Sequence, residues 1–200
     1  MNNHVHKDYA GAKLGMWLFL FTEVLLFGGM FVLYSAYFHE YPREFHIGGK
    51  QLDVVIGTLN TVVLLLSSFS IAAAITYIQQ GKKKLALIYT YLTIGAAFIF
   101  LVNKTIEWSA KFHHGIWPDS PHLRELSHGE NIFFGLYFLM TGLHALHVII
   151  GMVVLSVMVY FLKKDVINQQ DFVKLENAGL YWHIVDLIWI FLFPLFYLVL

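Results

Sequence analysis

Long, nearly charge-free stretches recur along the whole sequence, and this pattern restricts the fold more than any other feature. An α-helix needs about 20 apolar residues to cross the hydrocarbon core of a bilayer. Five runs meet this length, at residues 14–38, 54–77, 85–112, 132–162 and 175–200. Because the runs are continuous and do not alternate, they predict helices and not the strands of a membrane barrel. Charged residues make up only 13% of the chain, whereas soluble domains contain about a quarter. The sequence therefore predicts an all-α, polytopic bundle of five transmembrane helices that forms one membrane domain over residues 1–200.

The basic residues are divided unequally between the two sets of connections, and this division predicts the orientation. Cytoplasmic loops carry an excess of Lys and Arg. The N-terminus and the loops after the second and fourth spans carry eight of them: Lys7, Lys13, Lys82, Lys83, Lys84, Lys163, Lys164 and Lys174. The other two loops carry four: Arg43, Lys50, Lys111 and Arg124. We therefore expect the N-terminus in the cytoplasm and the C-terminus outside.

Composition also narrows the classes of function. The chain has no cysteine, which excludes disulfides, iron–sulfur clusters and thiolate-bound zinc or copper within it. Its net charge of zero gives no electrostatic support for a nucleic-acid partner. The polar first fourteen residues lack the short apolar core of a cleavable signal peptide, so none is expected.

Glu23 is the only formal charge between Lys13 and His39. It lies about 14 Å along the helix from the start of the first span, near the middle of the membrane. Ionisable groups at that depth are costly to insert, so each is a candidate for function. A protonated Glu23 that is hydrogen-bonded to a neighbouring helix is the structural alternative, and the sequence does not separate the two.

Lys104 and Glu107 lie one helical turn apart in the third span and are therefore able to pair. Lys104 also lies near the outer end of this span, where a lysine can extend its amine to the interface. For Lys104 we favour that interfacial interpretation. Glu107 precedes Trp108, which marks the interface, and a carboxylate on a short side chain reaches water poorly.

The last two spans carry further polar groups. His144 and His147 lie among small residues, which let another helix approach closely enough for hydrogen bonds between helices. Glu176, His183 and Asp186 fall on about one helical face, because offsets of seven and ten residues stay near the helical register. Facing inward, these groups would line a polar seam or groove.

A metal site is the alternative explanation for the two histidines. Di-iron bundles use histidines with a Glu on the same helical turn, and His144 and His147 have no such Glu. Haem ligation by one of them together with His183 is the remaining arrangement. The spacing therefore favours helix contacts over a metal.

Five segments carry a family resemblance: FLFTEVLLFGGMF (19–31), LNTVVLLLSS (59–68), EW (107–108), FFGLYFLMTGLHALHVIIG (133–151) and ENAGLYWHIVDLIWIFLFPLFY (176–197). Together they resemble subunit III of the haem–copper oxidases, which are the cytochrome c and quinol oxidases of aerobic respiration. The chain is similar to the shorter, five-helix bacterial members of this family over nearly its whole length.

The resemblance implies an accessory subunit without a redox centre of its own, multi-pass in the bacterial cytoplasmic membrane. Haem and copper would belong to partner subunits I and II, and this chain would pack on subunit I. The family's helices form a V-shaped cleft that holds phospholipid, and the subunit supports proton uptake and complex stability. Contacts with other respiratory complexes are left open. Glu23 matches the family's buried, carbodiimide-reactive carboxylate. The positions that match its polar residues around the cleft and the helix contacts are Glu107, His144, His147, Glu176, Trp182, His183 and Asp186.

Two departures from the family pattern bear on these expectations. Lys104 stands where many relatives have Gln, which leaves an ion pair with Glu107 open as the alternative. The segment QQDFVK (169–174) leaves only Lys174 for a lipid phosphate.

Two other functions compete with this interpretation. One is a stand-alone proton or ion transporter that uses Glu23 and the Lys104–Glu107 pair, but transporters usually show internal repeats and none is visible here. The other is an accessory subunit of a nitric oxide reductase, which the sequence separates poorly from an oxidase subunit.

Overall fold

The computed structural model describes residues 8–113, 115–117, 120–121, 123 and 126–198. Within them the chain forms six α-helices and no strand. The helices are α1 (Tyr9–Glu40), α2 (Pro42–Lys50), α3 (Val54–Gln79), α4 (Lys83–His113), α6 (His128–Lys163) and α7 (Val173–Tyr197). Five of them are long and apolar enough to cross a membrane, which confirms the predicted spans. The last two residues of the predicted fifth span, 199 and 200, lie outside the described residues.

Local sequence signals explain where several helices begin. The Asp8 carboxylate accepts a hydrogen bond from the Gly11 N–H at 2.8 Å, and the Asp53 carboxylate accepts one from the Val55 N–H at 2.9 Å. At the start of α6, Ser127 and Glu130 form a reciprocal capping box. Each cap satisfies N–H groups that the first turn of a helix cannot pair internally.

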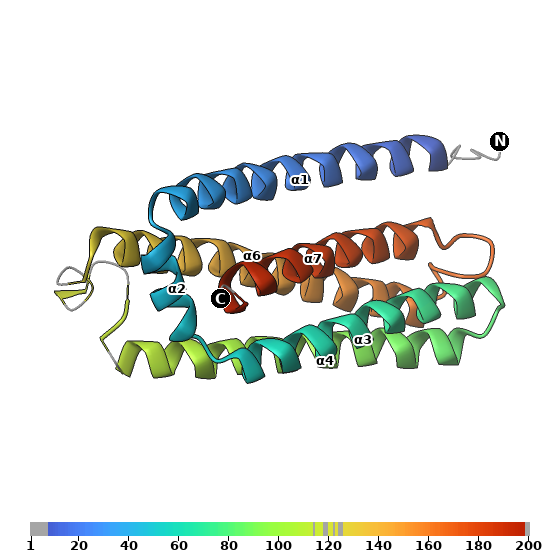
Figure 1. The fold of residues 1–200 in the computed structure, drawn as a ribbon. Helices are drawn as coiled ribbons and strands as arrows, with labels where there is room; N and C mark the ends of the chain where they lie inside the picture. Colours follow the sequence, from blue (N-terminus) through green and yellow to red (C-terminus); the bar gives the residue numbers. More distant parts are fainter. Residues whose placement is uncertain (1–7, 114, 118–119, 122, 124–125, 199–200) are drawn as a thin grey trace.

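The long helices run alternately up and down, so that the connections gather at two ends (Figure 1). The start of α1, the α3–α4 turn and the α6–α7 loop share one end, which contains most of the lysines. Helix α2, the end of α4 and the start of α6 lie at the opposite end. Lys7 and Arg124 lie outside the described residues; the other members of the two basic sets that the sequence distinguished lie at opposite ends of the bundle.

The segment between the first two spans is not the plain loop that we expected, because it contains α2. Pro42 occupies the first turn of this helix, where its missing N–H costs nothing. The Phe45 side chain is completely buried and packs against the rings of Tyr34 and Phe133, with centroids 5.2 and 5.3 Å away. A methyl group on Gly48 would lie within 3 Å of the Phe133 ring. Helix α2 thus lies across the end of the bundle and closes it.

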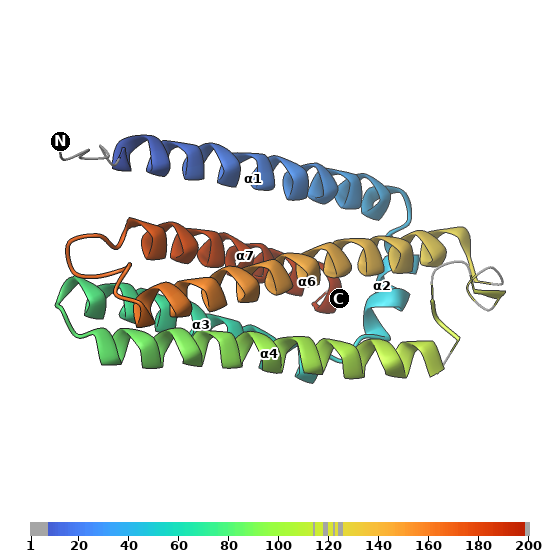
Figure 2. The ribbon, with the colours of Figure 1, turned by 180° about the vertical axis from the view of Figure 1, so that it is seen from behind.

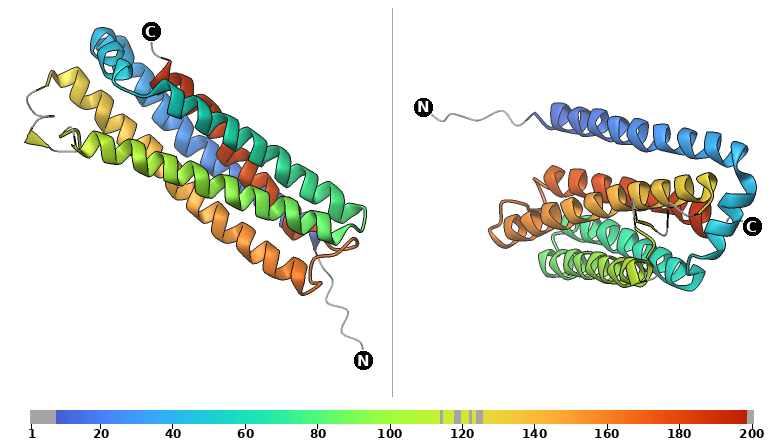
Figure 3. Two further views of the ribbon diagram at one scale, coloured as in Figure 1. Left: turned by 90° about the horizontal axis from the view of Figure 1, so that it is seen from below. Right: turned by 90° about the vertical axis from the view of Figure 1, so that its left-hand side faces the viewer.

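Helix α1 lies on one side of the other four long helices, as Figures 2 and 3 show from further directions. It packs against α6 and α7. Its buried residues, Leu20, Phe27 and Tyr34, are spaced by seven and form a single line. The Tyr34 hydroxyl donates to the carbonyl of Leu195 in α7 at 2.5 Å. Because only this line is covered, open grooves remain along both sides of α1, and these form the setting of the candidate site.

Candidate functional site

The predicted polar side chains do not converge on one centre. They lie in five places: Glu107 in a network of α4, α6 and α7; Glu23 with His147 between α1 and α6; Trp182, His183 and Asp186 on the α7 face toward α3; Glu176 at the lysine-rich end; and His144 alone in the core.

Lys104 and Glu107 form an ion pair inside the bundle. The Lys104 Nζ atom lies 3.1 Å from Glu107 Oε2, and each residue is 3% exposed. The interfacial position that we favoured for Lys104 is therefore wrong. Inside the bundle the ammonium group has a carboxylate, two tyrosine hydroxyls and ring faces as partners, so it does not extend to the interface. Its Nζ lies 5.4 Å from the centre of the Trp189 ring.

Two tyrosines complete this network. The hydroxyls of Tyr137 and Tyr197 donate to Glu107 Oε1 at 2.6 and 2.5 Å. The same two oxygens accept from Lys104 Nζ, at 3.2 Å for Tyr137 and 2.8 Å for Tyr197. Three donors of an ammonium group thus meet three acceptors, and both carboxylate oxygens are engaged. The network is electrically neutral and joins α4, α6 and α7 at one point.

Glu23 and His147 form a second pair, between α1 and α6. His147 Nε2 lies 2.9 Å from Glu23 Oε2, and His147 Nδ1 lies 2.7 Å from the carbonyl of Leu143. A carbonyl only accepts, so Nδ1 must carry a hydrogen. The Glu23–His147 contact then holds one proton, which sits either on the carboxyl group or on Nε2. The pair is therefore able to hold or pass a proton at these two atoms.

The two tryptophans of α7 bind hydroxyl groups of α3. The Trp182 Nε1–H donates to Ser67 Oγ at 2.9 Å, and the Trp189 Nε1–H donates to Thr61 Oγ1 at 3.0 Å. Both rings are buried. A buried indole N–H must find a partner, and these hydroxyls fix the register of α7 against α3.

The next positions continue this contact. Ser68 Oγ lies 2.7 Å from His183 Nδ1, and Asp186 is buried one helical turn further along α7. The Asn103 side-chain amide in α4 donates to Asn60 Oδ1 in α3 at 2.8 Å. These polar contacts form separate pairs along α3, a helix that the predicted seam did not include.

Glu176 lies toward the lysine-rich end, in a groove between α1, α3 and α7. Its carboxylate is 2.8 Å from Lys13 Nζ of α1 and 3.4 Å from the Gln79 side-chain amide of α3. The groove has a volume of about 470 Å³, and His183 and Trp17 also line it. Glu176 therefore connects the start of α1 to the rest of the bundle.

The His144 side chain is completely buried and packs against aromatic rings without forming a hydrogen bond to a described residue. Its ring lies 5.5 Å from the centre of Phe100 and 5.3 Å from that of Trp189. Neither ring nitrogen has a hydrogen-bond partner among the described residues. The expected hydrogen bond to another helix thus forms at His147 and not at His144. Within the described part of the chain, no three His, Asp or Glu side chains come close enough together to hold a metal ion.

The sequence interpretation overlooked several members of these clusters. Tyr137 and Tyr197 were not singled out, because tyrosines near a membrane interface are common and carry no specific signal. The polar residues of α3 did offer a signal, since Asn60 and Ser67 are spaced by seven and lie on one face of an otherwise apolar helix.

Comparison with known proteins agrees with this architecture. The family model of cytochrome c oxidase subunit III matches residues 1–199. A cytochrome c oxidase subunit 3 of Thermostichus vulcanus is 30% identical over 201 residues, which cover 98% of this chain and 90% of that protein. A probable quinol oxidase subunit 3 of Staphylococcus saprophyticus is 28% identical over 94% of this chain and 88% of its own length. A cytochrome bo(3) ubiquinol oxidase subunit 3 of Buchnera aphidicola is 26% identical, covering 98% of this chain and 92% of its own. With five helices long enough to span a membrane and a match from end to end, the chain belongs to the cytochrome c oxidase subunit III family of the haem–copper oxidases.

Proposed function

We propose that this chain is the accessory, non-redox subunit of a proton-pumping terminal oxidase that reduces oxygen to water. In this proposal it packs on subunit I, in a complex that includes subunit II, in the cytoplasmic membrane of a bacterium. Haem and copper belong to those partner subunits. The lysine-rich end faces the cytoplasm, as the distribution of basic residues predicts. The match of the family model over residues 1–199 is the observation that carries the proposal.

Proton uptake is the part of the proposal that rests on Glu23 and His147. The two side chains are 2.9 Å apart and only slightly exposed, between α1 and α6. One proton is held between them, because the Leu143 carbonyl fixes the other ring nitrogen. A group that exchanges a proton within the membrane beside subunit I would assist delivery to the pump without itself crossing the bilayer.

Lipid binding is the part that rests on the grooves along α1. One groove, between α1, α6 and α7, has a volume of about 380 Å³ and contains Met16, Tyr181 and Lys174 in its lining. The Lys174 ammonium lies 5.2 Å from the centre of the Phe161 ring. We propose that the grooves on the two sides of α1 are the phospholipid-holding cleft and that Lys174 meets a lipid phosphate. Glu176 and His183 border this cleft, whereas Glu107, His144, His147, Trp182 and Asp186 hold the helices together.

The complex itself is the first thing to test. The chain is tagged, purified in mild detergent, and examined by optical spectroscopy and peptide identification. Haem absorbance with subunits I and II in the same preparation is the expected result. The positions of the haem bands then identify the haem type and so the class of oxidase. A preparation that reduces nitric oxide but not oxygen would contradict the oxidase assignment. A colourless, solitary and folded chain would support the transporter alternative.

The role of Glu23 is tested in that purified complex. Replacing it with Gln in E23Q keeps the size of the side chain but removes the acidic group that can take up and release a proton. We expect slower proton uptake and a shorter working life during turnover, with unchanged haem content. Thr22→Val on the same helix is the matched control, because the Thr22 hydroxyl bonds only its own helix, at the Phe19 carbonyl. Equal rates of proton uptake in E23Q and wild type would remove this part of the proposal.

A further inference from the structure

A large apolar groove runs between α4 and α6, away from the grooves beside α1. Its volume is about 640 Å³. The Ser156 hydroxyl in its wall donates to the carbonyl of Met152 at 2.7 Å, so its hydrogen is not free for a polar ligand. The groove therefore suits a hydrocarbon chain. Its lining consists of Phe98, Leu101, Ile149, Met152, Val153, Ser156, Val157 and Tyr160.

Gly95 leaves further space on the α4 side. It lies on the same helical face as Tyr91 and Phe98, four residues after one and three before the other. No atom lies within 4 Å of the position that a Cβ atom on Gly95 would occupy. Glycine inside a helix is destabilising relative to alanine, so Gly95 does not serve the stability of α4. Its lack of a side chain leaves room beside the groove.

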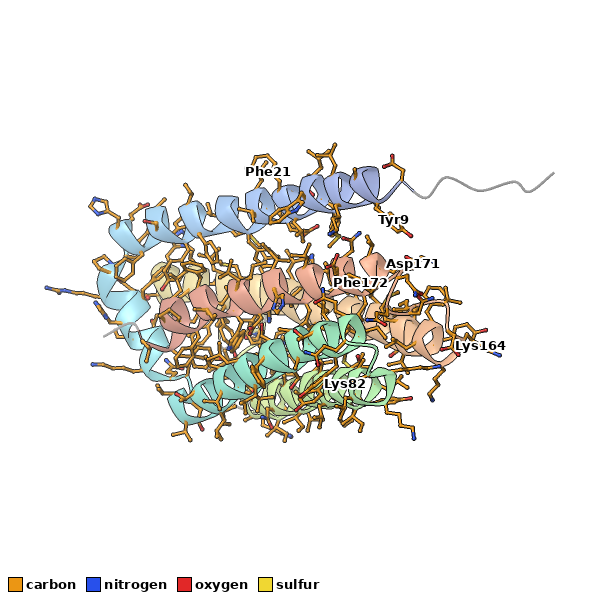
Figure 4. All side chains as sticks on the ribbon, turned by 90° about the vertical axis from the view of Figure 1, so that its right-hand side faces the viewer. Tyr9, Phe21, Lys82, Lys164, Asp171 and Phe172 are labelled. Atoms are coloured by element: carbon orange, nitrogen blue, oxygen red, sulfur yellow. The ribbon has the colours of Figure 1, made fainter. Side chains whose placement is uncertain are left out.

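Two lysines lie at the end of this groove that is nearest the α6–α7 loop. The Lys163 ammonium reaches from α6 to the Tyr91 ring of α4, 5.4 Å from its centre. Lys164, labelled in Figure 4, lies 6.0 Å from the centre of the Tyr160 ring, which lines the groove. The adjacent carboxylate, Asp165, is engaged by Lys83 at 2.6 Å. The two ammonium groups thus face the region where lipid headgroups would lie.

We propose that this groove binds an anionic glycerophospholipid, with its phosphate at Lys163 and Lys164 and an acyl chain against the apolar wall. Basic residues beside a transmembrane helix attract anionic headgroups, and the lysine stems extend along aromatic rings at the depth of the interface. A helix from another subunit would cover the apolar wall but would match the two cations only if it carried acidic groups at the same depth. The site uses α4 and a different set of α6 residues from the proposed cleft beside α1, and it does not depend on that cleft.

The absence of cysteine makes a direct test practical. A single fluorophore is attached to V153C in the full chain, which is then reconstituted in lipid bilayers. The bilayers contain either phosphatidylglycerol or phosphatidylcholine with brominated acyl chains, and the bromine atoms quench a fluorophore that they contact. Val153 lines the groove and is 59% exposed, whereas Val62 on α3, 48% exposed, provides the matched position V62C. We expect phosphatidylglycerol to quench the label at V153C at about tenfold lower mole fraction than phosphatidylcholine, from the combined attraction of two lysines. The label at V62C should show no such preference.

Charge variants separate the site from general attraction to the bilayer. The preference at V153C should disappear in K163Q/K164Q and persist in K50Q/K82Q, which removes the same charge elsewhere. Equal quenching by the two lipids at V153C, or the same preference at V62C, would overturn the proposal. So would protection of V153C from both lipids in the assembled complex, because a partner helix would then occupy the groove.

Discussion

The contribution of a buried polar residue to the stability of this protein depends on how many of its polar atoms have hydrogen-bond or ion-pair partners. Lys104 shows this, because all three of its donors meet acceptors inside the bundle. Removing one partner from a buried ion pair leaves an uncompensated charge, which costs more than the pair itself contributes.

We therefore predict that Lys104→Met destabilises the chain by about 3 to 5 kcal/mol, since the Glu107 charge loses its partner. The double variant K104M/E107L should recover most of this loss. Thermal unfolding in detergent measures both, with the exposed Lys84→Met on the same helix as the control. A K104M variant as stable as K84M would show that the pair contributes nothing.

Glu23 and His147 allow a test of coupling between two residues. In a double-mutant cycle with E23A and H147A, we expect a coupling free energy of about 0.6 to 2 kcal/mol, the range of hydrogen bonds between transmembrane helices. The cycle is measured by unfolding in detergent. If the losses of unfolding free energy in the two single variants simply added, the 2.9 Å contact between Glu23 and His147 would not stabilise the packing of α1 on α6.

Two helices of the bundle can approach each other closely only where the residues between them are small. Gly151 of α6 faces α7, and a methyl group there would lie 2.8 Å from the Trp182 ring. Gly135 of the same helix has nothing within 4 Å. These two glycines form a matched pair, because the same substitution meets a neighbouring helix at one position and open space at the other.

We predict that Gly151→Ala destabilises the chain by about 1 to 3 kcal/mol, as overpacking does. Gly135→Ala should be neutral or slightly stabilising, since alanine favours the helix more than glycine does. Both are measured as shifts in thermal unfolding. Equal effects at the two positions would indicate that α7 moves away from α6 without cost.

Helix α2 provides a second test at this scale, because it closes one end of the bundle. Phe45 is 0% exposed and Ile47 on the same helix is 51% exposed. We predict a loss of about 3 to 5 kcal/mol for Phe45→Ala and little change for Ile47→Ala, measured by unfolding in detergent. If the two losses matched, α2 would not be packed on the bundle.

The whole molecule has two chemically different ends, and the lysine-rich end is predicted to face the cytoplasm. Cysteines introduced at Lys50 and Lys82 report on opposite ends of the bundle, and no natural cysteine interferes. A membrane-impermeant thiol reagent added to intact cells should label K50C and leave K82C unlabelled until the membrane is opened. The reverse pattern would contradict the orientation.

The sequence determined the number of long helices, their approximate boundaries and the two ends of the bundle, because bilayer thickness imposes the length and apolarity of each span. It also placed candidate polar groups on the correct helices. These properties are local, since each depends on residues that are close in the chain.

The tertiary structure decided which polar groups meet. Glu107 is joined by Tyr197, ninety positions later, and Glu23 by His147. Such contacts depend on how helices are rotated and how closely they pack, which no local pattern specifies. Helix α2 escaped prediction for a related reason: nine residues are too few to form a stable helix alone, and burial of Phe45 against the bundle stabilises it.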